Sequence, residues 1–222
     1  MRNLIKKFIR NHFDNPFRCY GQSGEDLVLD RLLNGKRMGF YIDVGAHHPT
    51  RFSNTYLFYK KGWSGINIDA NPKSMELFNR RRSRDINIEV GIAKKNGLLT
   101  YYQFNEPALN TFNEEEAQLK NTQPYHLVKT VQVPVKKLGD ILREYLPPHQ
   151  MIDFLTIDVE GFEMQVLESN YWDSFRPMYI LVEILRSSLS QINSEELVIY
   201  LSTLNYAPVC KIYDTMIFKS CS

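Results

Sequence analysis

The chain has 222 residues, of which 43% are apolar and 13% aromatic, a composition typical of a globular domain and not of a disordered chain. Its 27 Lys and Arg residues nearly balance its 25 Asp and Glu residues, and the net charge of +2 excludes a strong overall attraction to nucleic acid. The three cysteines, Cys19, Cys210 and Cys221, form no CxxC pair, which predicts reduced thiols in a cytoplasmic protein rather than a disulfide framework or a zinc site.

Residues 1–17 predict an amphipathic helix, because apolar side chains recur on one face while Lys and Arg occupy the other. Two interpretations remain open: peripheral contact with the anionic surface of an inner membrane, or packing on the domain or on a dimer partner. No stretch approaches 18 uninterrupted apolar residues, so we expect no membrane span, and the N-terminus lacks the apolar core of a secretory signal. We expect an extension over residues 1–19 and a single domain over residues 20–222.

The next predicted elements are a loop over residues 20–26 and a helix that ends at Leu33. A strand, a glycine turn and the N-terminus of a second helix follow. The strand is the apolar run Phe40–Val44, the turn contains Gly45, and Ser53–Thr55 supplies residues typical of a helix N-cap. In a doubly wound sheet this order builds a nucleotide pocket, because a residue without a Cβ lets a ligand approach the backbone closely.

The glycine pattern favours S-adenosylmethionine over a dinucleotide. A dinucleotide site needs roughly G-x-G-x-x-G, whereas here Gly45 is the only glycine of the turn. Asp43 on the first strand repels phosphate but suits the amine of the cofactor. Asp69 ends a second strand 24 residues after Gly45, where it can accept hydrogen bonds from ribose hydroxyls, with Ala70 beside it. We expect Ser53 and Asn54, at a helix N-terminus, to hold the methionyl carboxylate.

Further along the chain, a helix is expected after Pro72, and the basic run Arg80–Arg84 reads as its solvated end rather than as a nucleic-acid patch. The strand Ile86–Val90 follows, and Gly91 and Ile92 after it are candidate adenine contacts. Residues 98–104 predict an extra strand. Val131–Val135 predicts a strand that contains a proline and therefore lies at an edge.

Residues 105–125 interrupt the regular alternation at the carboxyl edge of the sheet, where acceptor selection belongs. Asn110 and Thr111 are its candidates for binding a polyhydroxylated acceptor. The remaining elements are core strands ending at Asp158 and Glu183, and a closing hairpin over residues 206–219.

Five segments in series resemble the FkbM-type methyltransferase family, and the resemblance covers about residues 20–185. The segments are Gln22–Asp26, Ile42–Ala46 with Ser53–Thr55, Lys61–Pro72, Ala108–Phe112 and Asp153–Glu163. The resemblance implies S-adenosylmethionine as cofactor, a loop carrying Gln22 and Glu25 (or Asp26) over its pocket, and hydroxyl acceptors such as sugars of surface glycans or positions on secondary metabolites. The expected fold is a class I methyltransferase: an α/β, Rossmann-like, mostly parallel seven-stranded sheet with helices on both faces, a C-terminal antiparallel hairpin and one reversed edge strand.

Carboxylates at the ends of several strands mark the expected active site. Asp158 is the first candidate for the base that takes the acceptor proton, and Glu160 is the second. His47 and His48 directly follow Gly45, so one of them can reach the acceptor, and His48 is the further candidate. Glu183 is a candidate acceptor contact. Asp158, Glu160 and a histidine have no diagnostic metal spacing, so no metal is expected.

The sequence therefore favours an S-adenosylmethionine-dependent O-methyltransferase acting on a sugar or glycan hydroxyl. A nucleic-acid methyltransferase is the second hypothesis, although the chain has no basic stripe with interleaved aromatic residues. A non-catalytic binding module is the third, and it would be expected to have lost Asp43, Gly45 or Asp69, all of which are present.

Overall fold

The computed structural model describes residues 18–221, so the helix expected over residues 1–17 lies outside the described residues. The helices are α2 (Glu25–Leu32), α3 (Tyr56–Lys60), α4 (Ser74–Arg81), α5 (Glu114–Lys120), α6 (Leu138–Tyr145), α7 (Glu163–Glu168) and α8 (Glu196–Thr203), with 3-10 turns η1 (Pro107–Leu109) and η2 (Ile192–Ser194). The strands are β1 (Phe40–Val44), β2 (Ser64–Asp69), β3 (Ile86–Glu89), β4 (Gly91–Ile92), β5 (Gly97–Phe104), β6 (Leu127–Lys136), β7 (Phe154–Ile157), β8 (Tyr179–Glu183), β9 (Tyr206–Ile212) and β10 (Thr215–Ser220).

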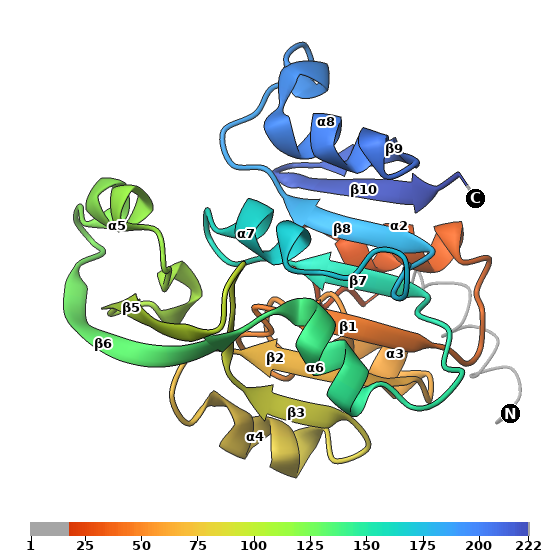
Figure 1. Ribbon diagram of the computed structural model, residues 1–222, viewed down its shortest axis with the longest axis horizontal. Helices are drawn as coiled ribbons and strands as arrows, with labels where there is room; N and C mark the ends of the chain where they lie inside the picture. The colour runs from red at the N-terminus through yellow and green to blue at the C-terminus, as the bar shows by residue number, and fades with distance from the viewer. Residues whose placement is uncertain (1–17, 222) are drawn as a thin grey trace, which may run out of the picture.

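Seven strands form the main sheet in the order β3-β2-β1-β7-β8-β10-β9 (Figure 1). The first five are parallel, and β10 runs antiparallel to both of its neighbours. This confirms the expected sheet with its C-terminal hairpin. The expectation of a reversed edge strand is wrong, because the reversed strand β10 lies inside the sheet. Its residues Met216–Phe218 are buried, whereas β9 contains Pro208 and exposed side chains that suit an edge.

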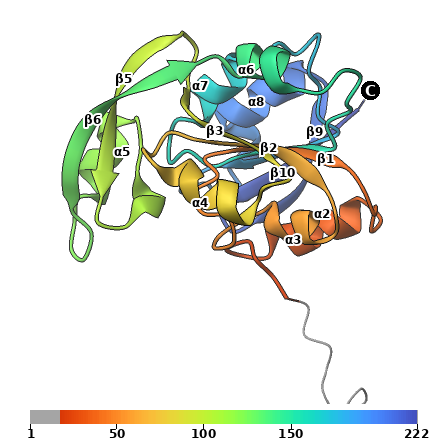
Figure 2. The same ribbon diagram turned by 90° about the horizontal axis from the view of Figure 1, so that it is seen from below.

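Alternate side chains of the central strands fill two separate cores. On β1, Ile42 packs with α6, α7 and α8, while Tyr41 packs with α2 and Phe58 of α3. Figure 2 shows these two groups of helices on opposite faces of the sheet. Every residue of β1 is buried, as parallel strands covered on both faces require. The two layers therefore fix the carboxyl ends of β1, β2 and β7 side by side at one edge.

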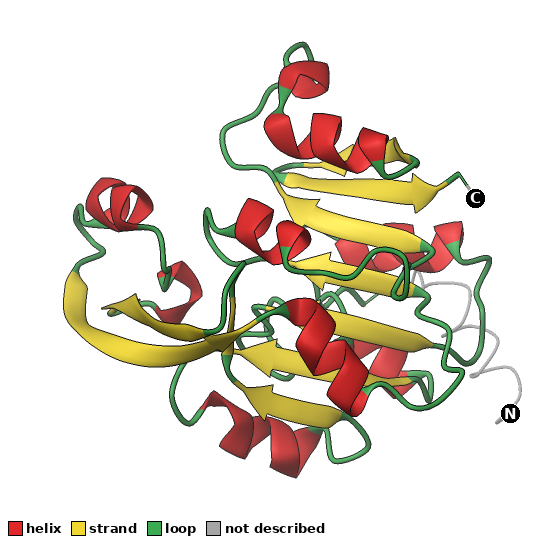
Figure 3. Ribbon diagram, viewed as in Figure 1, coloured by secondary structure: helices red, strands yellow, loops and turns green. Residues whose placement is uncertain are grey.

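A second sheet of three strands, in the order β4-β6-β5, projects beside the carboxyl ends of the parallel strands (Figures 1 and 3). The expectation that the strand with Pro134 is an edge strand is wrong, because β6 lies in the middle of this sheet. The proline is tolerated there because β4 pairs with β6 only at Val135 and Lys136, so Pro134 faces one paired neighbour, Leu98 of β5. We call β5, β6, η1 and α5 the arm.

One arginine of the predicted solvated helix end is in fact fully buried. Arg82 donates from Nε to Asp85 Oδ2 (2.8 Å) and from Nη2 to the hydroxyl of Tyr41 (2.8 Å) and to Thr55 Oγ1 (3.1 Å). Its neighbour Arg81 is exposed, as expected. Arg82 therefore ties the start of the α4–β3 connection to β1 and to the segment before α3.

We expect the substitution Arg82→Met to lower the free energy of unfolding by about 3–5 kcal/mol, because it leaves Asp85 buried without its cation. The exposed neighbour offers a matched control, and Arg81→Met should change stability by about 0.5 kcal/mol or less. Urea unfolding followed by circular dichroism measures both. Equal stabilities of the two variants would contradict the structural role of Arg82.

Candidate active site

The site begins at the glycine turn after β1. Gly45 has φ +83°, and a Cβ at this position would lie 1.7 Å from the carbonyl oxygen of Asp158. No other residue fits, since the turn passes directly against the end of β7. The amides of Gly45 and Ala46 donate to the carbonyl of Ile68 on β2. The turn is thereby fixed between the strands that carry Asp69 and Asp158.

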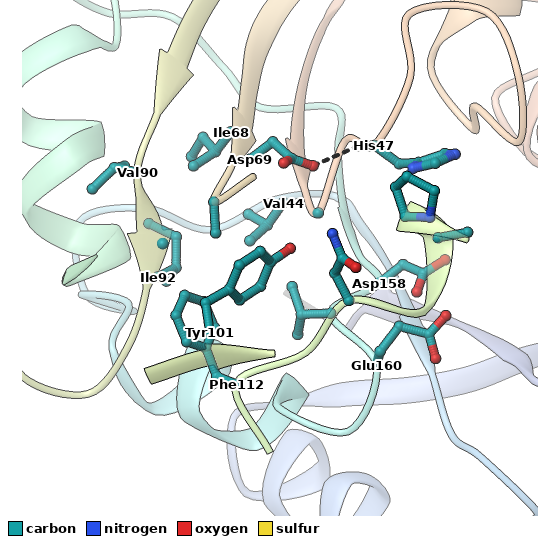
Figure 4. A pocket seen from close by; sticks show the side chains of 17 residues that line it. Val44, His47, Ile68, Asp69, Val90, Ile92, Tyr101, Phe112, Asp158 and Glu160 are labelled. Carbon is teal, nitrogen blue, oxygen red and sulfur yellow. Dashed lines mark hydrogen bonds between the residues drawn. The ribbon is translucent and has the colours of Figure 1, made fainter. Parts of the chain in front are cut away.

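A cleft of about 480 Å³ opens over this turn (Figure 4). One end is mainly apolar and includes Ile92 and Phe112, and the other end carries the carboxylates of Asp158 and Glu160. Asp69 lies between these ends, at the wall formed by β2. A cleft that changes from apolar to acidic along its length can take a ligand with an aromatic base at one end and a cation at the other.

Asp69 is buried at the wall of the cleft and is held by backbone amides. Its Oδ2 accepts from the amide of His47 and its Oδ1 from the amide of Asn71, both at 2.7 Å. Burial raises the pKa of Asp69 above its usual value, and the two amides act in the opposite direction. Each oxygen of a carboxylate can accept a second hydrogen bond, so the side chain can also bind hydroxyl groups of a ligand.

The apolar end contains the residues expected to contact a base. Gly91 and Ile92 line the cleft, as does Ala70 next to Asp69. A Cβ on Gly91 would lie 2.5 Å from the ring of Phe112, so the absence of a side chain lets that ring close the end of the cleft. Tyr101 of β5 is buried beside it.

Two of the expected cofactor residues, Asp43 and Ser53, are buried and do not line the cleft. The Asp43 Oδ2 accepts from Thr55 Oγ1 at 2.6 Å, and burial raises the pKa of this carboxyl to about 6. Ser53 is buried, and its hydroxyl accepts from the amide of Tyr56, the first residue of helix α3. Asp43 and Ser53 thus hold the glycine turn and the following helix in position.

A second pocket of about 410 Å³ shares Asp158 with the first and is lined by Gln22, Glu25, Asn54 and Glu183. The carboxylate of Glu25 accepts from the amide of Ser23, and Asn54 Nδ2 donates to Thr156 Oγ1 on β7 (3.1 Å). The loop before α2 thus lies beside the carboxylates at the ends of β7 and β8.

Asp158, Glu160 and Glu183 bring carboxylate oxygens within 4.8 Å of one another. Burial and then the neighbouring carboxylates raise the pKa of Asp158 well above its usual value and that of Glu183 to about 11. A raised pKa makes a deprotonated carboxylate a stronger proton acceptor, which is the property that a base requires. Oxygen atoms this close together could also hold a divalent cation, so the expectation of a metal-free site stays a prediction.

The two histidines of the turn have different surroundings. His48 Nδ1 accepts from the amides of Thr50 and Arg51, and His48 lines neither of the pockets that contain Asp158 and Glu183. His47 does line the cleft, and its pKa is lowered to about 4 by burial and by the nearby Arg51 guanidinium. Of the two histidines that follow Gly45, His47 therefore lines the cleft, and the assignment of His48 as a base stays a prediction.

The two expected acceptor residues of the 105–125 segment are both buried and engaged. Asn110 lines the cleft, and its Oδ1 accepts from the amide of Phe104. Thr111 donates its hydroxyl to the carbonyl oxygen of Glu160 at 2.9 Å and does not line either pocket. Thr111 thus contacts the protein backbone at the site.

Sequence reasoning missed two side chains that shape the site. Lys120 forms an ion pair with Glu160, and Arg82 reaches Thr55, which holds Asp43. Each comes from an element far from its partner in the sequence, and no local pattern marks it.

The sheet order, the glycine turn and an acidic residue at the end of the second strand define a class I methyltransferase fold with its cleft at the carboxyl edge. No helix among residues 18–221 has the length and apolar character needed to cross a bilayer.

The family model described as the methyltransferase FkbM domain matches residues 43–207, and the chain belongs to this family. The protein is a methyltransferase. No curated protein matches the chain.

Solved structures similar to this chain include three other methyltransferases. The METTL16 MTase domain is 13% identical with a TM-score of 0.47, covering 100% of this chain and 79% of that one. The C-terminal domain of precorrin-6Y C5,15-methyltransferase from Rhodobacter capsulatus is 11% identical with a TM-score of 0.43, and the match covers 93% of this chain and 90% of that one. The human methyltransferase 10 domain containing protein is 13% identical with a TM-score of 0.45, covering 99% and 94%. At these identities the similarity carries no information about the substrate.

Proposed function

We propose that the protein transfers a methyl group from S-adenosylmethionine to a hydroxyl of a sugar or surface glycan. The observation that carries the proposal is that two pockets share one lining residue: both are lined by Asp158, so a donor in one and an acceptor in the other would meet at this carboxylate. S-adenosylmethionine supplies an electrophilic methyl group on a sulfonium when it is bound.

The residues of the larger cleft fit this donor. The apolar end with Gly91 and Ile92 suits an adenine, and Asp69 retains acceptor capacity for ribose hydroxyls. The carboxylates of Asp158 and Glu160 suit the positive charge of the sulfonium. A pyrophosphate in place of the sulfonium would meet two carboxylates, which argues against a dinucleotide.

Several features of the second pocket support a polyhydroxylated acceptor. Gln22 and Asn54 offer amide donors and acceptors, and Glu25 and Glu183 offer carboxyl groups, all of which bind sugar hydroxyls. The rings of Phe52 and Tyr213 also line it and are exposed enough to stack against a sugar face. Among residues 18–221, no Lys or Arg lines this pocket, which disfavours a nucleic-acid backbone.

In this proposal Asp158 orients the acceptor hydroxyl and takes its proton as the oxygen attacks. The pKa of Asp158 is raised above its usual value by burial and by the neighbouring carboxylates, and a raised pKa makes a carboxylate a stronger proton acceptor. Holding donor and acceptor against one side chain also supplies the orientation that a displacement reaction needs.

The acceptor is identified by incubating the purified protein with S-adenosylmethionine carrying a labelled methyl group and a panel of acceptors. The panel contains nucleotide sugars, glycan fragments, single-stranded DNA and RNA. We expect labelled methyl ethers on one or more of the sugar compounds. Label on the nucleic acids alone would contradict the proposal and favour the nucleic-acid alternative.

A further inference from the structure

The arm holds the loop that carries the candidate base. In the loop Asp158–Gly161, the carbonyl of Glu160 accepts from Thr111 Oγ1 and the carbonyl of Gly161 accepts from Asn113 Nδ2, both at 2.9 Å. The donors come from the segment between η1 and α5, which sequence reasoning assigned to acceptor binding. These bonds connect the arm to the backbone of the candidate active site.

Helix α5 of the arm also packs directly on this loop. Glu160 has φ +57° and Gly161 has φ +94°, left-handed conformations that need support from their surroundings when the residue is not glycine. A Cβ on Gly161 would lie 2.5 Å from Cγ of Glu116, the buried glutamate of α5. The close approach of α5 therefore depends on the glycine that follows Glu160.

The same helix delivers a lysine to the site. Lys120 Nζ lies 2.5 Å from Glu160 Oε2 and 4.0 Å from Glu116 Oε2, and the side chains of Lys120 and Glu160 are only 13% and 16% exposed. Glu116 is in turn bound by the guanidinium of Arg186, from the segment after β8. A pair this sheltered from water interacts more strongly than a surface ion pair.

We infer that Lys120 is a positioning residue: its ammonium group holds the Glu160 carboxylate against α5 and so sets the negative charge that faces the sulfonium end of the donor. The inference rests on the proposed function, because it assumes that S-adenosylmethionine occupies the cleft. It assigns the arm a part in donor recognition.

The charge near Glu160 comes from several elements packed around it. Besides Lys120, the titratable groups that act on it or respond to it are Tyr101, Glu116, Asp158, Glu163, Glu183 and Asp214. None of these six groups is a cation. The positive charge beside Glu160 is that of Lys120, which lowers the pKa of Glu160 against the effect of burial. Without the lysine, a sulfonium faces a more negative site at high pH, and Glu160 takes up a proton at a higher pH.

The comparison of S-adenosylmethionine with S-adenosylhomocysteine isolates this effect, because the two differ by the methyl group and its positive charge. We would measure both dissociation constants by isothermal titration from pH 5 to 8 for the wild type, Lys120→Met, Lys120→Arg and Lys129→Met. Lys129 is an exposed lysine of β6 in the same arm and serves as the matched control. The ionisable groups of each ligand are the same in every experiment. Differences between variants in the pH dependence of binding therefore come from the protein.

We expect two changes in Lys120→Met. The preference for S-adenosylmethionine over S-adenosylhomocysteine should rise several-fold at pH 8. The pH at which half of this preference is lost should be about one unit higher than in the wild type. Lys120→Arg should restore the wild-type profile, and Lys129→Met should match it throughout. A purely structural role would weaken both ligands equally and leave their ratio unchanged, which would overturn the inference. If the wild type binds neither ligand, the proposed function itself fails, a result distinct from an unchanged ratio.

Discussion

The substitution Asp69→Ala is expected to weaken binding of S-adenosylmethionine by about ten- to a hundredfold. The carboxylate is the group at the end of β2 that can accept hydrogen bonds from the ribose, and hydrogen bonds to charged groups are worth about 1.5–3 kcal/mol. The same side chain holds the amides of His47 and Asn71, so its loss also loosens the glycine turn. Isothermal titration of the purified variant measures the change.

The control for this variant is Glu89→Ala. Glu89 lies opposite Asp69 in the register of β2 and β3, is exposed, and does not line the cleft. We expect it to bind the donor as the wild type does. Asp69→Ala with unchanged donor affinity would remove the ribose assignment, provided that circular dichroism shows both variants to be folded.

The substitution Asp158→Asn is expected to reduce turnover by about 10²–10⁴-fold, the usual contribution of a general base, while donor affinity changes far less. Initial rates with an acceptor found in the screen, and isothermal titration with the donor, separate the two effects. In the wild type, turnover should fall as the pH is lowered through a range well above the ordinary pKa of an aspartate, because the pKa of Asp158 is raised and only its deprotonated form accepts the proton.

Asp173→Asn is the matched control, since Asp173 is an exposed aspartate outside both pockets. It should retain wild-type turnover and the same pH dependence. Near-wild-type turnover in Asp158→Asn would remove Asp158 from the catalytic role and would direct attention to Glu160, the second candidate for the base.

Most of the main sheet could be predicted from the sequence because its signals are local. Phe40–Val44 and Phe154–Ile157 are mainly apolar runs of strand length. Each is followed by a turn that contains a glycine, Gly45 after the first run and Gly161 after the second. The position of β10 and the central place of β6 could not be predicted in this way. Both depend on which strands pair, and pairing is decided by burial across the whole sheet.

For the site, the sequence predicted which residues end the strands but not what their side chains contact. Asp69 and Asp158 line the cleft because the carboxyl ends of parallel strands meet at one edge. Asp43 lies near the end of a strand as well, yet its carboxylate is bound by Thr55, which is in turn bound by Arg82. A contact of this kind with Arg82, across the fold, leaves no local signal. Lys120 escaped prediction for the same reason, as it reaches Glu160 from the arm.

The central claim is that the cleft between Asp69 and Asp158 binds S-adenosylmethionine. Isothermal titration of the wild-type protein with S-adenosylmethionine and S-adenosylhomocysteine, with NAD as the control ligand, tests it most directly. We predict micromolar binding of the first two and none of NAD. Binding of NAD, or binding of none of the three by folded protein, would contradict it.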